Sequence, residues 1–150
     1  MRMIILTILS AVLMAAQEKT MTVKRLTPNL LADDVQSCVK FWVERMHFEK
    51  TGEVPDGNKL AFASLQKGSF ELMYQSYASM EKEPDAAARY QKGTAFLFLE
   101  VDDLDAVLAA MQGAPMVTQV HKTFYGSTEF TVKDPAGHWI TFANFAAAHP

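Results

Sequence analysis

The sequence predicts an α+β fold built from two paired βαβββ modules. The main observation is an internal repeat, because residues 26–35 and residues 95–104 each read as an apolar strand, an Asp-Asp step and the start of a helix. The two Asp-Asp steps lie 69 residues apart, close to half of the chain that follows the N-terminal segment. Turn signals then divide the residues after each helix into three short strands. This repeat predicts two copies of one unit and a place where the copies meet.

The first module is expected over residues 24–75. Its opening strand, residues 24–32, contains Pro28, which suits an edge strand or the beginning of a strand. Asp33 or Asp34 then caps a helix that runs to about residue 46, with an apolar stripe at helical spacing. The three strands that complete the module are expected at residues 47–54, 59–66 and 69–75.

The second module is expected over residues 93–145, after a linker at residues 76–92. The linker is polar and rich in alanine and glutamate, and we expect a short helix in it around residues 85–90. The module begins with a strand at residues 94–101 and continues with a helix capped by Asp102. Its last three strands are expected at residues 116–121, 127–133 and 139–145.

Each helix must bury its apolar stripe against one face of its sheet, so the alternating residues of the strands face the other side. If the modules pair, the residues that face away from the helices line one concave surface. These residues are Thr27, Asn29, Leu31, Glu71, Met73, Gln75, Phe96, Phe98, Glu100, Trp139, Thr141 and Ala143.

The N-terminal segment differs from the rest of the chain. Arg2 precedes an apolar run from Met3 to Ala16, which is too short to cross a bilayer comfortably and is typical of a secretory signal. We therefore expect residues 1–20 to be a leader and the protein to be exported, to the periplasm or outside the cell. The alternative is a true start at Met21, which would make the protein cytoplasmic.

Composition excludes several classes of function. The net charge is −3 and no basic run occurs, so nucleic-acid binding is not expected. The single cysteine, Cys38, rules out an internal disulfide and lies on an apolar helix stripe, so we interpret it as a core residue. No glycine-rich cofactor loop or nucleophile elbow is present, and no cofactor is expected.

Several motifs in this order make the chain similar to the vicinal oxygen chelate superfamily, which includes glyoxalase I, extradiol dioxygenases and bleomycin-resistance proteins. The resemblance covers about residues 24–145. It implies two βαβββ modules whose curled sheets enclose a cavity, usually in a homodimer. The motifs that carry it are the Asp-Asp step before Phe41-Trp42-Val43 and His47-Phe48-Glu49, Phe70-Glu71-Leu72-Met73, Val101-Asp102-Asp103-Leu104, Glu129-Phe130 and Asp134-Pro135-Ala136-Gly137-His138.

The metal-dependent members that the chain resembles place one ligand on each of four strands. By position, the corresponding residues are Thr27, Glu71, Phe96 and Thr141, of which only Glu71 is a good ligand. A divalent transition metal requires about three or four histidine, carboxylate or thiolate ligands. We therefore expect no catalytic metal.

The resemblance is closest to bleomycin-resistance-like members, which bind a small molecule without chemistry. We expect such a binding protein, as a homodimer, with no nucleic-acid partner and no membrane contact once the leader is removed. The expected ligand-binding residues are Thr27, Asn29, Glu71, Met73, Phe96, Phe98, Trp139 and Thr141. A mostly apolar pocket with a few polar groups is what a small-molecule site needs.

Other interpretations of these residues stay open. Phe96 and Phe98 could simply pack in the core, Glu71 could form a surface salt bridge, and His138 is expected to be a solvated loop residue. The second functional hypothesis is an enzyme of the same fold, a lyase, isomerase or dioxygenase, with Glu71 as base or metal ligand. The third is an interaction domain whose cavity is filled by its own side chains.

Overall fold

The computed structural model describes residues 23–83, 85 and 91–145, and it confirms two βαβββ modules in series. The first module and the short helix after it comprise β1 Asn29–Ala32, α1 Val35–Met46, β2 Glu49–Asp56, β3 Lys59–Lys67, β4 Phe70–Ser76 and α2 Tyr77–Met80. The second module comprises β5 Phe96–Glu100, α4 Leu104–Ala110, β6 Met116–Lys122, β7 Ser127–Lys133 and β8 Trp139–Phe145.

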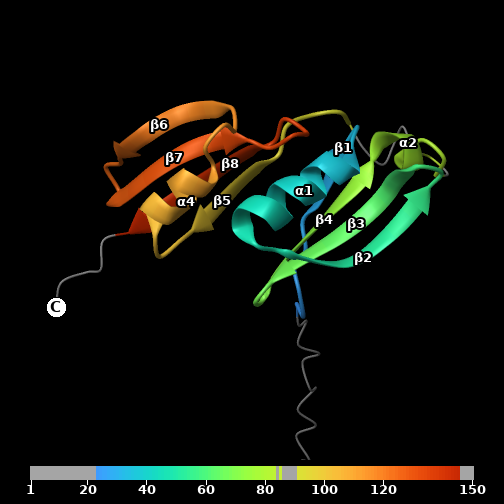
Figure 1. The fold of residues 1–150 in the computed structure, drawn as a ribbon, viewed down its shortest axis with the longest axis horizontal. Coiled ribbons are helices and arrows are strands. Elements are labelled where there is room, and N and C mark those ends of the chain that lie inside the picture. The colour runs from blue at the N-terminus through green and yellow to red at the C-terminus, as the bar shows by residue number, and fades with distance from the viewer. Residues whose placement is uncertain (1–22, 84, 86–90, 146–150) are drawn as a thin grey trace, which may run out of the picture.

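Each module forms its own four-stranded sheet (Figure 1). The strand order is β1-β4-β3-β2 in the first sheet and β5-β8-β7-β6 in the second, so the two copies have the same topology. In each sheet the opening strand pairs in parallel with the closing strand, and the remaining pairs are antiparallel. The two sheets stay separate and do not close into a barrel.

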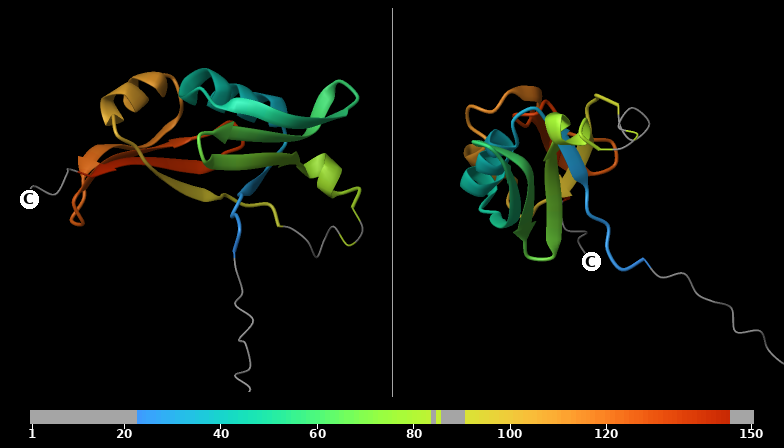
Figure 2. Two further views of the ribbon diagram at one scale, coloured as in Figure 1. Left: turned by 90° about the horizontal axis from the view of Figure 1, so that it is seen from below. Right: turned by 90° about the vertical axis from the view of Figure 1, so that its right-hand side faces the viewer.

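The helices α1 and α4 lie on the same side of the two sheets (Figure 2). The core sits between the helices and the sheets. The apolar stripe of α1 contributes Val35, Cys38, Phe41 and Trp42 to this core. Burial raises the pKa of the Cys38 thiol, as expected for a core cysteine rather than a nucleophile. Neither α1 nor α4 covers the opposite face of each sheet, and we call that face the helix-free face.

An aspartate caps each of the two long helices. The Asp34 carboxylate accepts a hydrogen bond from the Ser37 backbone N–H, and the Asp103 carboxylate accepts one from the Ala106 N–H. The predicted cap of the second helix, Asp102, was therefore wrong by one residue. The following residue takes the cap because α4 begins only at Leu104.

Replacing Asp34 by alanine is expected to lower the free energy of unfolding at pH 7 by about 1 kcal/mol. The hydrogen bonds from the Ser37 side chain and backbone lower the pKa of Asp34 below its ordinary value of 3.8. The stabilisation is therefore present above that value and is lost as the pH falls through the lower, folded-state pKa. Urea unfolding of both proteins between pH 7 and pH 3 should show the difference shrinking only at the acidic end. A constant difference over this range would contradict the assignment.

A buried hydrogen-bond chain joins the two modules. The Trp42 indole N–H donates to the Tyr74 hydroxyl over 2.8 Å, and that hydroxyl donates to Asp134 Oδ2 over 2.5 Å. Asp134 Oδ1 accepts from the backbone N–H groups of Ala136 and His138, at 3.0 and 2.8 Å. Trp42 and Tyr74 belong to the first module and Asp134 to the second, so the turn after β7 is inserted against the first module's core.

His138 makes a second link between the modules. Its Nδ1 accepts the Ala95 backbone N–H over 2.9 Å, and its Nε2 lies 2.8 Å from the Leu31 carbonyl oxygen. The residue is only 3% exposed, so the prediction of a solvated loop residue was wrong. Asp134 and His138, at the two ends of the turn, are buried against the other module although Pro135 between them is exposed. The imidazole lies between β1 and the start of β5.

The helices are also joined directly. Arg45, in the last turn of α1, donates from Nη1 to the backbone carbonyls of Ala110 and Gln112, each over 2.8 Å. These carbonyls lie at the C-terminal end of α4, where the helix leaves its carbonyls without partners and favours a positive charge. Arg45 therefore links the C-terminal end of α1 to the C-terminal end of α4.

Two expectations lie partly or wholly outside the described residues. The leader at residues 1–20 is outside them, so export and cleavage stay predictions. The linker helix expected around residues 85–90 also falls almost entirely outside, whereas the linker begins with α2 at Tyr77–Met80. In the described part of the chain, no helix combines the length and apolar character needed to cross a membrane.

Candidate functional site

The helix-free face of the first sheet is polar and internally paired. Glu71 on β4 forms an ion pair with Arg25, with 2.6 Å between Nη1 and Oε2. The hydroxyl of Thr27 lies 3.4 Å from the same oxygen. Asn29 donates to the Gln75 side-chain oxygen over 3.1 Å. Glu71 therefore takes part in a salt bridge, one of the roles considered for it, with its side chain 18% exposed.

The helix-free face of the second sheet is aromatic. Phe96 packs edge-on against Trp139, with ring centroids 5.1 Å apart, and Phe98 lies 6.5 Å from Phe145. Phe96 is 70% exposed and Phe98 is 54% exposed, so neither ring is packed in the core. Thr141, which pairs with Phe98 across the strands, shares a hydrogen bond of 2.8 Å with Thr131.

The predicted site residues thus form two sets. The structure brings Thr27 together with Glu71 on the first sheet, and Phe96 with Trp139 on the second. Strand pairing adds Met73, opposite Asn29, to the first set. It adds Thr141, opposite Phe98, to the second. These hydrogen bonds, ring contacts and strand pairs lie within each set, so a single site made from both remains a prediction.

The four positions that correspond to metal ligands do not fit a transition metal. Phe96 has no donor atom, and the two threonine hydroxyls are poor ligands. Glu71 is paired with the Arg25 guanidinium, whose positive charge opposes a bound cation. Over the described ranges, no three histidine, cysteine or carboxylate side chains come close enough to hold a metal ion.

Sequence reasoning missed a polar cluster on the second sheet, which we call the Glu129 cluster and which consists of Glu129, Tyr125, Ser127 and His121. Glu129 Oε2 accepts from the Tyr125 hydroxyl over 2.7 Å and from the Ser127 hydroxyl over 3.0 Å. His121 Nε2 lies 3.7 Å from Glu129 Oε1. The alternation in β7 could have revealed it, because Phe130 and Val132 face the core and Glu129 must face the other side.

Glu129 is 9% exposed and has no arginine or lysine partner among the ion pairs of the described residues. Glu71, by contrast, is paired with Arg25, whose side chain is largely exposed. Tyr125 lies beside the carboxylate and is linked by ring contacts to Phe145 at 6.4 Å and to Phe124 at 5.2 Å. The hydrogen bond to Glu129 raises the pKa of Tyr125, so its hydroxyl stays a donor. The second sheet therefore combines aromatic rings with a largely buried carboxylate.

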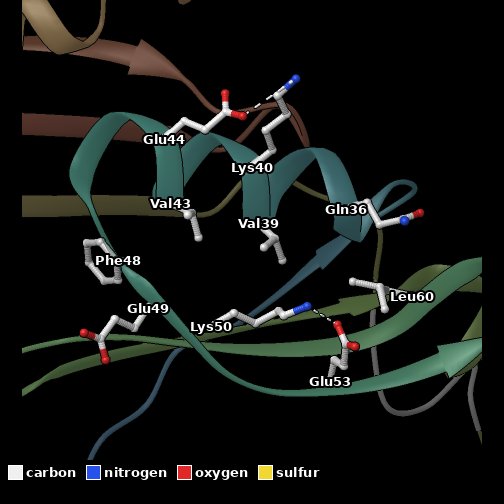
Figure 3. Close-up of a pocket in the computed structure, with 10 residues that line it drawn as sticks. All are labelled: Gln36, Val39, Lys40, Val43, Glu44, Phe48, Glu49, Lys50, Glu53 and Leu60. Carbon is white, nitrogen blue, oxygen red and sulfur yellow. Dashed lines mark hydrogen bonds and ion pairs between the residues drawn. The ribbon is translucent and has the colours of Figure 1, made fainter.

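A groove of about 770 Å³ lies on the other side of the molecule, between α1 and the strands β2 and β3 (Figure 3). Val39 and Val43 point into it from the helix, and Phe48 and Leu60 complete its apolar lining. Its charged residues include the ion pairs Lys40–Glu44 and Lys50–Glu53. None of the predicted ligand-binding residues lines this groove.

The fold and its two faces define a class of protein: duplicated βαβββ modules with their helices on one side and two helix-free sheet faces on the other. The sequence profile of the Glyoxalase/Bleomycin resistance protein/Dioxygenase superfamily matches residues 22–142. The chain therefore belongs to this superfamily.

Individual relatives agree with this assignment. The chain is 32% identical over 123 residues to an uncharacterized protein of Mycobacterium bovis, covering 75% of this chain and 78% of that protein. Its structure is similar to TioX from Micromonospora sp. ML1, with a TM-score of 0.65, 20% identity and coverage of 83% and 100%. It is also similar to lactoylglutathione lyase from Agrobacterium tumefaciens, with a TM-score of 0.65, 16% identity and coverage of 80% and 92%. At these identities the structural likeness shows the fold alone.

Proposed function

We propose that this protein binds a small molecule that contains an aromatic or apolar group, and that it does so without a catalytic metal. The observation that carries the proposal is the exposure of Phe96 and Phe98 on a sheet face, where each ring already has an aromatic neighbour. A contiguous exposed apolar patch of this kind is unusual on a protein surface and typically marks a binding site.

The polar groups around these rings suit a binding role. Thr141 lies opposite Phe98 in the strand pairing and is partly exposed, and its hydroxyl, which shares a hydrogen bond with the buried Thr131, can act as donor or acceptor toward a ligand. Small-molecule sites typically combine apolar walls with a few such groups. The alternative in which Glu71 acts as a base is not favoured, because its carboxylate is engaged by Arg25 and Thr27.

A homodimer is part of the same proposal. Two copies that face each other through their helix-free faces would shield the exposed rings and convert the open aromatic face into the wall of an enclosed cleft. The high exposure of Phe96 and Phe98 in a single chain supports this arrangement. Sedimentation equilibrium of the purified protein tests it, and a strict monomer at micromolar concentration would remove the dimer from the proposal.

Titration with 2-phenylethanol, followed by nuclear magnetic resonance (NMR), tests the binding proposal. We expect saturable shifts at Phe98, Thr141 and Phe145, and binding about three- to tenfold weaker in Phe98→Ala, the effect of one lost aromatic contact. Phe70→Ala is the control, because Phe70 is also an exposed ring, at 72% against 54% for Phe98, but lies at the start of β4 in the first sheet. Equal effects of the two substitutions, or an unsaturable response, would contradict the proposal.

A further inference from the structure

When the His121 imidazole is neutral, two acceptor atoms of the Glu129 cluster lie next to each other with no hydrogen between them. These atoms are His121 Nε2 and Glu129 Oε1. His121 Nδ1 lies 2.8 Å from the Gln119 carbonyl oxygen, which can only accept, so the ring hydrogen is on Nδ1. The Nε2 of a neutral ring then carries a lone pair, and this atom lies 3.7 Å from Glu129 Oε1. This separation is longer than a hydrogen bond.

The other carboxylate oxygen is already satisfied. The hydroxyls of Tyr125 and Ser127 both donate to Oε2, and the Ser127 hydroxyl is further held by Thr123 at 2.8 Å. Because these donors sit on one oxygen, they fix the carboxylate and leave Oε1 directed at the imidazole. A negative charge that is only 9% exposed is costly without a compensating cation.

The surroundings of this pair suit an organic cation. The Tyr125 ring adjoins Phe145, which in turn adjoins Phe98, so aromatic faces continue from the carboxylate to the rings of the proposed binding face. Aromatic faces attract ammonium groups. His121 is 46% exposed in its side chain, which leaves the pair accessible from solvent.

We propose that Glu129 Oε1 and His121 Nε2 together bind the protonated amine of a ligand whose aromatic part lies on Phe98 and Phe145. An ammonium group carries several N–H donors, so one can reach the carboxylate and another the imidazole. The charge-assisted bond to Glu129 compensates the buried carboxylate, and the two acceptors no longer oppose each other. This inference rests on the proposed function, since it names the class of ligand that the same face takes.

The test compares two probes of similar shape, 2-phenylethylamine and 2-phenylethanol. At pH 8 the amine is protonated, and we expect it to bind about tenfold or more tightly than the alcohol. The nitrogen shifts of the His121 ring should show an Nδ1–H tautomer before addition and a perturbed Nε2 afterwards.

Variants separate this inference from the proposed function. Glu129→Gln should reduce the preference for the amine to about twofold or less while the alcohol still binds. We expect the same result for His121→Ala, a second variant that removes a half-exposed side chain. Glu53→Gln is the matched control, because that carboxylate on β2 is paired with Lys50 and lies outside the predicted binding residues, and it should leave the preference unchanged. Equal binding of the two probes to the unmodified protein, or a doubly protonated His121 ring without ligand, would overturn the inference. Binding of the alcohol would still support the proposed function, and loss of both would refute both.

Discussion

Replacing Asp134 by alanine is expected to lower the free energy of unfolding by about 3–5 kcal/mol. The carboxylate is 3% exposed and accepts hydrogen bonds from the Tyr74 hydroxyl and from the backbone N–H groups of Ala136 and His138. Its removal leaves these donors without a partner in a region closed to water, and the indole N–H of Trp42 loses the fixed orientation of its acceptor. Urea unfolding at pH 7, with slopes compared between the proteins, measures the loss.

Two further variants give this prediction its controls. Asp134→Asn keeps one oxygen acceptor for the backbone N–H groups, so we expect it to cost less than the alanine variant, about 1–3 kcal/mol. Asp33→Ala removes an exposed aspartate that lies next to the helix cap, and its effect should stay within about 0.5 kcal/mol. Equal losses for Asp134→Ala and Asp33→Ala would show that the buried chain does not stabilise the fold.

His138→Ala is expected to destabilise the protein by about 2–4 kcal/mol and to loosen the connection between the modules. The imidazole is the partner of the Ala95 N–H in one module and of the Leu31 carbonyl in the other. Without it, both partly buried backbone groups lose a hydrogen bond, and the space of an almost fully buried imidazole is left empty. Amide hydrogen exchange should therefore accelerate at Ala95 and at the neighbouring residues of β5, beyond what the loss of global stability explains.

Asn144→Ala provides the comparison within one module. The Asn144 amide donates to the backbone carbonyls of Val101 and Asp102, at 2.7 and 3.0 Å, and all three residues belong to the second module. We expect a loss of stability of about 1–2 kcal/mol without the selective increase in exchange at Ala95. If the two variants accelerate exchange at Ala95 equally, His138 is not a link between modules.

Sequence periodicity predicted the sheet faces well because alternation in a strand is a local property. The side chains assigned to the helix side of β1 and β4, such as Leu30, Leu72 and Tyr74, are buried, and Phe96 and Phe98 are exposed on the other face. The same rule applied to β7 would have shown that Glu129 lies on the face away from the helices. It was missed because the sequence does not show that Tyr125, four residues away across a turn, bonds back to that carboxylate.

His138 shows what alternation cannot reveal. It follows a turn of Asp, Pro, Ala and Gly, residues that normally face solvent, and only the docking of this turn against β1 buries it. Likewise, Glu71 looked available in the sequence, and its pairing with Arg25 depends on the chain before β1 running beside β4.

Local patterns were enough to predict the duplicated βαβββ order, the two helices that begin after aspartates and the side of each sheet that faces them, because each depends on residues close together in the chain. Contacts between distant segments establish which carboxylate is paired with an arginine and which lies beside an imidazole. They also establish how the modules are joined through Asp134 and His138. These contacts connect residues on different strands and modules, up to 107 positions apart for His138 and Leu31, and no local pattern records such distances.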